Sequence, residues 1–283
     1  MTLPLTERNR TSEKSASLGS SVEREVVTAP ALNVGEPYVS RLSSRASLYA
    51  DLRRLVDAVP RPLSRSEYRR LVVEENLLVR RTFSAREMAW KYVAARYGMD
   101  ASSPLFAIFV DEYRRATSEN DRSLTAYLLF ALRDRLVCDL GTDWLCQYLQ
   151  TAPAELRSRD VFSFLKAREA VHPEVLKWSA SSRENLVSHY FSALKEFGLA
   201  RGSMRKLTVR PAPGAAPVRF LLRVLVSSGV GSLGAVQSPL FKLLGLTLEE
   251  TVTVLFRLSA EGSLRCRIQG DVVDLDLGVE LES

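Results

Sequence analysis

The sequence predicts a mainly α-helical protein with an N-terminal helix-turn-helix part and C-terminal winged-helix-like parts, whose wings are short β-hairpins. Three observations predict this fold class. Apolar residues recur at spacings of three and four over much of the 283-residue chain, which is the period of an amphipathic helix. Several of these stretches open with Ser or Thr followed three residues later by Glu, the pattern of a capping box. Two of the helices are followed by a glycine and then by a short segment in which apolar and polar residues alternate, as in a β-hairpin.

The composition indicates an ordinary globular chain. Hydrophobic residues make up 46% and charged residues 25%, which excludes a wholly disordered, collagen-like or disulfide-scaffold protein. The length favours about two folding units, and we place them at 41–150 and 151–283. Residues 1–40 are poor in large apolar side chains, so we expect a disordered extension there. The three Cys and two His are too scattered for a four-ligand zinc site, so neither a metal nor another cofactor is predicted.

The same features predict a cytoplasmic protein without a membrane partner. The first residues, MTLPLTERNRTSEKS, contain no apolar run of the kind that a secretory signal needs. The longest uncharged run, 224–241, is interrupted by Gly, Pro and Ser and is too broken to span a bilayer. A chain of this length with few cysteines suits a reducing compartment.

Charge is unevenly distributed along the chain. The net charge is +6, but residues 41–97 carry thirteen basic and six acidic groups, or +7. Residues 201–245 carry seven basic and no acidic groups, also +7, whereas residues 246–283 carry three basic and eight acidic groups, or −5. Two basic blocks and an acidic end favour a polyanionic partner. A generally arginine-rich composition is the alternative explanation.

The first helices are predicted inside the first basic block. Residues 46–59 place leucines on one face, and Pro60 ends that helix. The next helix begins at Ser64, with Glu67 three residues later completing a capping box. A four-residue connector, Arg80–Phe83, then leads into a third helix.

This third helix is expected to begin at Ser84, which Glu87 follows three residues later, and to end at Gly98. Its apolar stripe, expected to be buried, is Ala85, Met88, Ala89, Tyr92 and Val93. A helix, a short turn and a capped helix form a helix-turn-helix, whose second helix would face DNA. The candidate DNA contacts of this part are Arg80, Arg81, Ser84, Arg86 and Lys91, aided by the helix N-terminus. A solvated charged face is the alternative.

Residues 99–170 are predicted to form a structural block of further helices. The candidates are Leu105–Arg115, Ser123–Val137, Thr142–Leu149 and a helix that opens at Ser158. Because the charge of this block is near neutral, we expect its role to be mainly structural.

A long helix capped by Ser181 or Ser182 is predicted to run to Phe197, with Gly198 closing it. Its buried stripe is Val187, Tyr190, Phe191, Leu194 and Phe197, and a separate polar face carries Ser188, Ser192 and Lys195. The following LARGSMRKLTVRP reads as a hairpin that turns at Gly202-Ser203. A helix followed by Gly-Leu and a basic hairpin is the winged-helix pattern, and the wing's candidate DNA contacts are Arg201, Arg205, Lys206 and Arg210. A basic loop that only aids solubility is the alternative.

The C-terminal part repeats this pattern. Apolar residues at helical spacing over 218–226 predict a helix, and another runs from the cap Thr247 to Gly262. A hairpin over 263–278 turns at Gln269-Gly270-Asp271. Its acidic residues are Asp271, Asp274 and Asp276, which suit packing or protein contact better than phosphate binding.

Four stretches, in this order and spacing, carry a family resemblance. They are ENLLVRRTFSAREMAWKYVAARYG (75–98), AELRSRDVFSFLKAREAVHPEVLKWSASSRENLVSHYFSALKEFGL (154–199), SPLFKLLGLTLEETVTVLFRLSAEG (238–262) and the terminal hairpin with Gly270-Asp271. Together they resemble the BrxA family, small proteins of the BREX bacteriophage-exclusion systems of bacteria, over approximately 40–278. The resemblance implies an all-helical protein with helix-turn-helix and winged-helix parts that binds double-stranded DNA in phage defence. It implies no enzymatic activity.

The residues predict no catalysis. His172 and His189 have no carboxylate or Ser partner at useful spacing. Asp134, Asp139 and Asp143 would have to surround a metal in a nuclease, but acids at this spacing are common on helix surfaces. We therefore predict a non-catalytic protein with no small-molecule substrate, which binds double-stranded DNA mainly through phosphates. The alternatives are an assembly adaptor that contacts other BREX defence proteins through its helical middle and acidic C-terminal hairpin, and an RNA-binding helical module.

Overall fold

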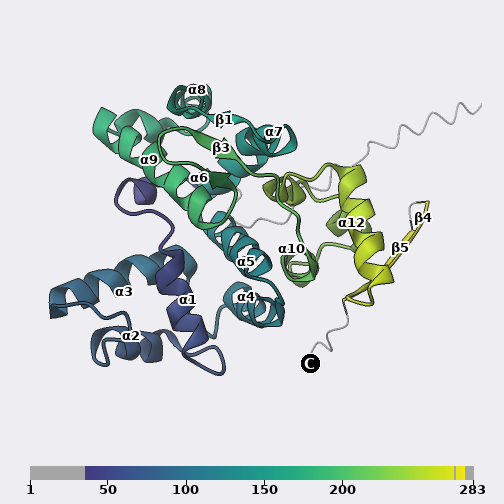
Figure 1. Ribbon diagram of the computed structural model, residues 1–283, viewed down its shortest axis with the longest axis horizontal. Helices are drawn as coiled ribbons and strands as arrows, with labels where there is room; N and C mark the ends of the chain where they lie inside the picture. Colours follow the sequence, from purple (N-terminus) through teal and green to yellow (C-terminus); the bar gives the residue numbers. More distant parts are fainter. Residues whose placement is uncertain (1–35, 271, 278–283) are drawn as a thin grey trace, which may run out of the picture.

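The computed structural model describes residues 36–270 and 272–277, and the protein is mainly α-helical, as predicted (Figure 1). The α-helices are α1 (Tyr49–Asp57), α2 (Arg65–Val73), α3 (Phe83–Tyr97), α4 (Pro104–Arg115), α5 (Glu119–Leu132), α6 (Arg135–Asp139), α7 (Cys146–Gln150), α8 (Ser158–Arg168), α9 (Ala180–Glu196), α10 (Ala215–Ser227), α11 (Ser232–Val236) and α12 (Leu248–Ala260). Short 3-10 helices are η1 (Ser40–Ser43), η3 (Pro173–Lys177) and η4 (Pro239–Leu244), and η2 (Leu140–Leu145) is a π-helical segment. The strands are β1 (Glu155–Leu156), β2 (Ala200–Arg201), β3 (Lys206–Thr208), β4 (Arg265–Gln269) and β5 (Val272–Asp276).

Helix α5 forms the centre of the core. Each residue from Ser123 to Leu132 is buried, so neighbours cover this helix on all sides, as expected for a helix that is apolar around its circumference. Figure 1 shows α4 and α10 beside it, α1 to α3 below it and α6 to α9 above it. The ring of Phe130 lies 5.5 Å from that of Phe197 at the end of α9, which joins the centre to the upper part.

A buried ion network ties α4 to α10. Glu112 is fully buried and pairs with Arg219 at 2.9 Å and with Arg223 at 2.8 Å. A buried carboxylate is tolerated only when it is paired, so these arginines, which belong to the second basic block, are structural. Packing of α10 on α4 and α5, and of η1 on α9, crosses the boundary that we expected at 150.

The end of the predicted N-terminal extension packs against the fold. The Tyr38 side chain is buried, its hydroxyl donates to Asp139 at 2.8 Å, and its ring stacks on His172 with centroids 3.6 Å apart. Residues 36–40 are therefore part of the folded body, contrary to the predicted disorder. Residues 1–35 lie outside the described part of the chain.

The helix predicted over Ser123–Val137 is divided between α5 and α6, and α6 continues through Gly141. The π-helical η2 joins α6 to α7, and a Cβ on Gly141 would lie 2.3 Å from the Leu243 side chain and 2.8 Å from the Tyr127 hydroxyl. Glycine is therefore needed for close packing of η2 on η4, and it does not end the helix.

A small antiparallel sheet follows the same order as a winged helix. The strands lie in the order β1-β3-β2, with Glu155 opposite Leu207 and Ala200 opposite Thr208. Along the chain the order is α7, β1, α8, α9, β2, β3, so the second hairpin strand pairs with the strand that precedes α8. This arrangement holds the loop between β2 and β3 beside α9.

The C-terminal hairpin lies at the opposite side of the molecule, against α12 (Figure 1). Leu264 and Cys266 are buried on its inner face. Its charged face is not simply acidic, because Arg265 stands opposite Asp276 and Arg267 opposite Asp274 in the register. Asp271 lies outside the described residues. No helix in the described ranges is long and apolar enough to cross a membrane.

Candidate nucleic-acid interface

Helix α9 begins earlier than predicted. Its N-cap is Ser179, whose hydroxyl accepts the N–H of Ser182 at 3.1 Å, so the cap expected at Ser181 or Ser182 is wrong. In the serine run Ser179-Ala180-Ser181-Ser182 each serine could cap, and Ser179 is the one with extended backbone angles. The predicted buried stripe is confirmed from Val187 to Phe197.

One face of α9 is open to solvent. It carries Ser181, Glu184, Asn185, Ser188, Ser192 and Lys195, which recur at spacings of three and four; we call this the open face. Ser192 donates to the Ser188 carbonyl at 2.9 Å, so its hydroxyl lies flat against the helix. The open face is therefore polar, with Lys195 as its cation and Glu184 as its carboxylate.

A second face of α9 is covered by the segment 41–47. His189 Nδ1 lies 2.6 Å from the Leu42 carbonyl oxygen, and Ser47 donates to Glu196. The predicted polar face of α9 is therefore open, whereas His189 is occupied by a structural contact.

The wing comprises residues 200–210, and residues 202–205 form a tight turn between its strands β2 and β3. Gly202 has φ +94° and lies so close to the Arg205 carbonyl that a Cβ would be 2.1 Å from that oxygen, so the turn requires glycine. Within the described chain the side chains of Arg201 and Arg205 have no hydrogen-bond or ion-pair partner, and both residues are exposed. Lys206 donates to the Ser203 carbonyl at 3.3 Å across the turn. The wing follows the C-terminal end of α9, and β2 packs against that helix.

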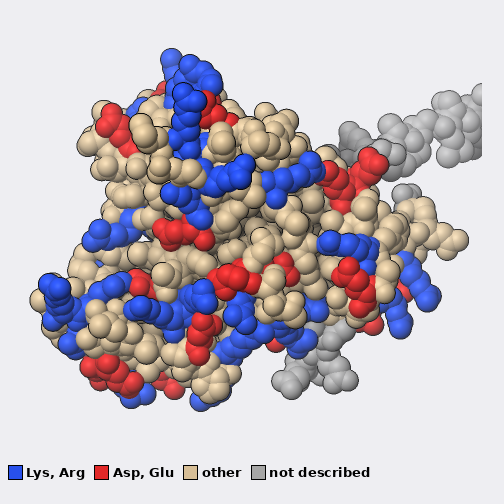
Figure 2. Space-filling view, viewed as in Figure 1, with Lys and Arg blue, Asp and Glu red and all other residues tan. Residues whose placement is uncertain are grey.

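Arg210 differs from the other predicted wing residues. It donates to the Gln150 carbonyl at 3.2 Å and pairs with Glu250 at the start of α12. Its charge is thus partly neutralised inside the protein. Figure 2 shows Lys and Arg side chains gathered around α8 and along the wing.

The α2–α3 pair is connected by a longer segment than predicted. The capping box of Ser64 and Glu67 is confirmed, but α2 ends at Val73, and the connection therefore spans 74–82. Leu78 is fully buried within this connection, which pulls the chain inward and breaks the helix that the sequence pattern extends to Val79. Nine residues replace the short turn of a helix-turn-helix.

The cap and the buried face of α3 also differ from prediction. Thr82, not Ser84, caps the helix, accepting the Ala85 N–H at 3.1 Å. The side chains that α3 buries are Trp90, Val93, Ala94, Arg96 and Tyr97. The expected buried residue Met88 is 41% exposed, because the helix is rotated toward a groove beside α1.

Two of the predicted cations near α3 are used inside the protein. Arg80 donates to both carboxylate oxygens of Asp51 at 2.7 Å. Arg86 is half-buried and donates to the Val73 carbonyl at 3.2 Å. Arg81 and Lys91 are exposed and have no polar partner among the described residues.

Arg41, Arg45 and Arg96, which the sequence analysis did not select, connect α3 to the segment that packs on α9. Arg96 is buried, and its guanidinium donates to the carbonyls of Arg41 and Arg45 at 3.2 and 3.1 Å. Burial lowers the pKa of Arg96 from its ordinary value. Figure 1 shows η1 and this segment between α3 and α9. The exposed Arg41 and Arg45 therefore lie between the two regions that were predicted to contact DNA, α2–α3 and α9 with the wing. Only the tertiary fold reveals this position.

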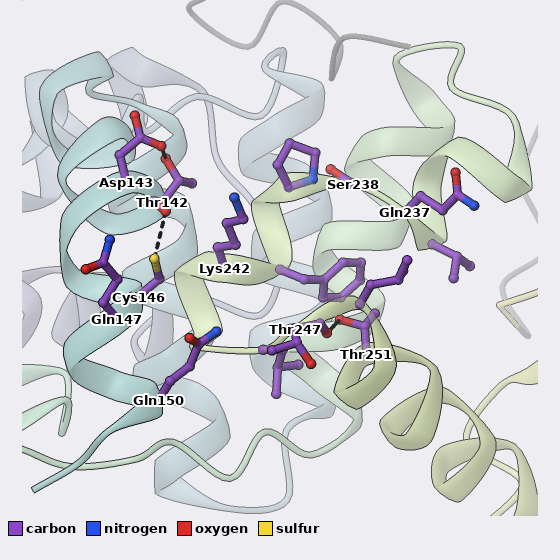
Figure 3. Close-up of a pocket in the computed structure, with 15 residues that line it drawn as sticks. Thr142, Asp143, Cys146, Gln147, Gln150, Gln237, Ser238, Lys242, Thr247 and Thr251 are labelled. Carbon is purple, nitrogen blue, oxygen red and sulfur yellow. Dashed lines mark hydrogen bonds between the residues drawn. The ribbon is translucent and has the colours of Figure 1, made fainter. Parts of the chain in front are cut away.

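A separate cavity of about 750 Å³ lies between α7 and the η4–α12 segment (Figure 3). Figure 3 shows Lys242 standing between the wall of Thr142 and the wall of Ser238. Cys146 donates to the Thr142 carbonyl at 2.9 Å, and burial raises the pKa of its thiol, which keeps it protonated and unreactive. The charged groups of its lining are the Lys242 ammonium and the Asp143 carboxylate, which accepts from the Thr142 hydroxyl at 3.0 Å and pairs with Arg168.

The three aspartates considered for a metal have structural partners. Asp134 caps α6, Asp139 accepts from Arg135 at 2.9 Å, and Asp143 pairs with Arg168. Within the described residues no three His, Cys, Asp or Glu side chains are grouped to hold a metal ion.

Comparison with known protein families shows to which family the chain is related. A family model described as BrxA matches residues 36–223, about two thirds of the chain. The match includes the open face and the wing. No curated protein matches the chain.

Proposed function

Because the chain belongs to the BrxA family, whose members are components of BREX phage-defence systems, we propose that it binds double-stranded DNA within such a system and performs no catalysis. The observation that carries the proposal is the open face of α9 beside the wing. Small polar side chains allow a helix to approach a groove closely, and the adjoining Lys195, Arg201 and Arg205 are free to contact phosphates.

The geometry favours duplex DNA over duplex RNA. The major groove of B-form DNA admits an α-helix, whereas the major groove of A-form RNA is too deep and narrow for side chains to read. With α9 in the groove, the wing would lie over the neighbouring backbone, where Arg201, Arg205 and Lys206 neutralise phosphates. Asn185 on the open face is the side chain best suited to a base edge.

Phosphate contacts would supply most of the affinity. Each neutralised phosphate releases counterions and contributes about −0.9 to the slope of log K against log salt. The three wing cations and Lys195 would therefore give a slope of about −3.6. A contact from Arg41 would make it steeper. We further propose that the protein acts in the cytoplasm together with other BREX proteins.

A fluorescence anisotropy titration of the full chain tests this proposal. The probes are a labelled DNA duplex of random sequence, an RNA duplex of the same length and single-stranded DNA, each titrated at several salt concentrations. We expect the DNA duplex to bind most tightly, with affinity falling steeply as salt rises. No duplex binding at low salt, or equal binding of the RNA duplex, would overturn the proposal.

A further inference from the structure

A groove of about 590 Å³ separates α3 from the start of α1. Its walls are formed by apolar side chains of both elements together with three charged residues. The lining comprises Leu48, Ala85, Met88, Ala89 and Tyr92, with Thr82, Ser84, Arg45, Asp51 and Arg80 around them. The face of α3 that its sequence pattern marks as core therefore has no covering element in the described protein.

The apolar wall includes a strained residue. Leu48 adopts φ +61° at the N-cap of α1, in the left-handed region that a residue with a Cβ enters only at a cost of about 1–2 kcal/mol. Such strain persists where the surrounding fold enforces it, and it is concentrated at binding sites. Here the strained residue, Leu48, is partly exposed and lines the groove together with Met88 and Tyr92.

The charges around the groove are mainly positive. Arg45 lines the groove and lies 5.7 Å from the centre of the Tyr92 ring. Arg81 and Lys91 do not line it, but each is next in sequence to a lining residue, Thr82 and Tyr92, and both are exposed without a side-chain polar partner in the described chain. The nearby carboxylates are already neutralised, since Asp51 binds Arg80 and Glu87 pairs with Arg69. An occupant of this groove would thus meet an apolar floor and a cationic rim.

We propose that the groove docks an acidic amphipathic segment of a partner protein. Apolar side chains of that segment would pack between Leu48 and Met88, and its carboxylates would face Arg45 and Arg81. An amphipathic helix in an apolar groove is a common mode of peptide recognition. Charge complementarity fixes the sign of the partner's flanking residues. The inference is independent of the proposed DNA surface, which lies on α9.

DNA is the less suitable occupant. Phosphates gain nothing from apolar contacts, and Arg80, one of the two cations that line the groove, is held by hydrogen bonds to Asp51. Exposed apolar patches instead mark protein contacts.

A peptide library displayed on phage tests the docking proposal. The library is selected on the full chain and counter-selected on the variant Met88→Glu, which places a negative charge in the groove. We expect enrichment of peptides that combine apolar residues at helical spacing with Asp and Glu. Failure to enrich any peptide that distinguishes the two proteins, or enrichment of basic peptides, would overturn the proposal.

The most enriched peptide is then measured by anisotropy against matched variants. We expect Met88→Glu and Arg45→Glu each to weaken binding at least about tenfold, equivalent to about 1.4 kcal/mol. Met88→Leu should retain binding, as should the control Phe256→Glu, which changes a 46% exposed side chain on α12. Unchanged thermal unfolding of Met88→Glu establishes that the loss is local. If Met88→Glu weakens duplex DNA as much as peptide, the groove belongs to the DNA surface and the proposal is wrong.

Discussion

The α2–α3 pair and the α9–wing region look alike in sequence and differ in structure. Both combine a helix, adjoining arginines and a serine-containing face. In the α9–wing region, Arg201 and Arg205 have no partner in the described chain. In the α2–α3 region, Arg80 and Arg86 are bound by groups of the protein itself, which leaves Arg81 and Lys91 as its exposed cations without a polar partner in the described chain. The number of basic residues in a segment therefore says less about polyanion binding than the number whose charge is free.

The α10 helix extends the same lesson. Its two arginines contribute to the basic charge of 201–245, but they neutralise the buried Glu112. Arginine is suited to this use because its planar guanidinium binds a carboxylate through several hydrogen bonds and is always charged. A count of basic residues along the sequence thus adds together arginines that neutralise buried carboxylates and arginines whose charge is available to a polyanion.

The largest effect is expected from removing the free cations of the wing. The double variant Arg201→Ala/Arg205→Ala should weaken duplex DNA binding about thirtyfold, because two lost phosphate contacts cost about 2 kcal/mol together. The salt slope should become shallower by about two. The control is Arg265→Ala/Arg267→Ala on the C-terminal hairpin, which should leave both quantities unchanged. Equal losses in the two double variants would mean that DNA responds only to total charge.

The next effect concerns stability in the α2–α3 region. Asp51→Ala leaves Arg80 without its bidentate partner and should lower the free energy of unfolding by about 1–2 kcal/mol, less than for a fully buried pair because Arg80 is 37% exposed. Denaturant unfolding measures this loss. The matched control is Asp57→Ala on the same helix, whose pair with Arg53 is exposed and should contribute less than about 0.5 kcal/mol. If the two variants unfold alike, Arg80 is not held by Asp51.

A smaller effect is expected on the open face of α9. Ser188→Glu should weaken duplex binding about fivefold, since like charges about 4 Å apart repel by about 1 kcal/mol in water. Ser188→Lys should strengthen binding, and Ser188→Ala should change little. Anisotropy at constant salt compares the three. An effect of the same sign for Glu and Lys would indicate a steric disturbance and would remove Ser188 from the DNA surface.

The smallest effect on DNA binding is expected for Arg80→Ala. Its guanidinium faces Asp51, so duplex affinity should change less than about twofold even though the protein is less stable. Arg81→Ala provides the comparison, because that side chain is exposed one residue later. A greater loss for Arg80→Ala than for the wing double variant would reverse the contrast between the two regions.

Local signals in the sequence predicted local structure well. The capping boxes at Ser64 and Thr247 are confirmed, as are the buried stripe of α9 and the hairpin that follows it. These features depend on residues close together in the chain, where propensity and hydrogen bonding decide the conformation.

Features that depend on distant residues were missed. Thr82 caps α3 because burial of Leu78 shortens α2 and shifts the connection, and no local pattern distinguishes Thr82 from Ser84. Helix periodicity placed Val93 of α3 correctly in the core but Ala85 and Met88 wrongly. The apolar residues of α3 extend around the helix, and the neighbouring elements decide which of them are covered. The partners of Arg80 and Arg210 are 29 and 40 residues away, beyond the range of any spacing argument.

Hydrogen–deuterium exchange of the full chain, with and without a saturating DNA duplex, tests the central claim most directly. Amides that DNA covers or rigidifies exchange more slowly, so the experiment locates the contact without any substitution. We predict slower exchange in the second half of α9 and across 200–208, with little change in the 74–82 connection. Protection confined to 74–97, with the wing unaffected, would contradict the account and return the DNA surface to the α2–α3 pair.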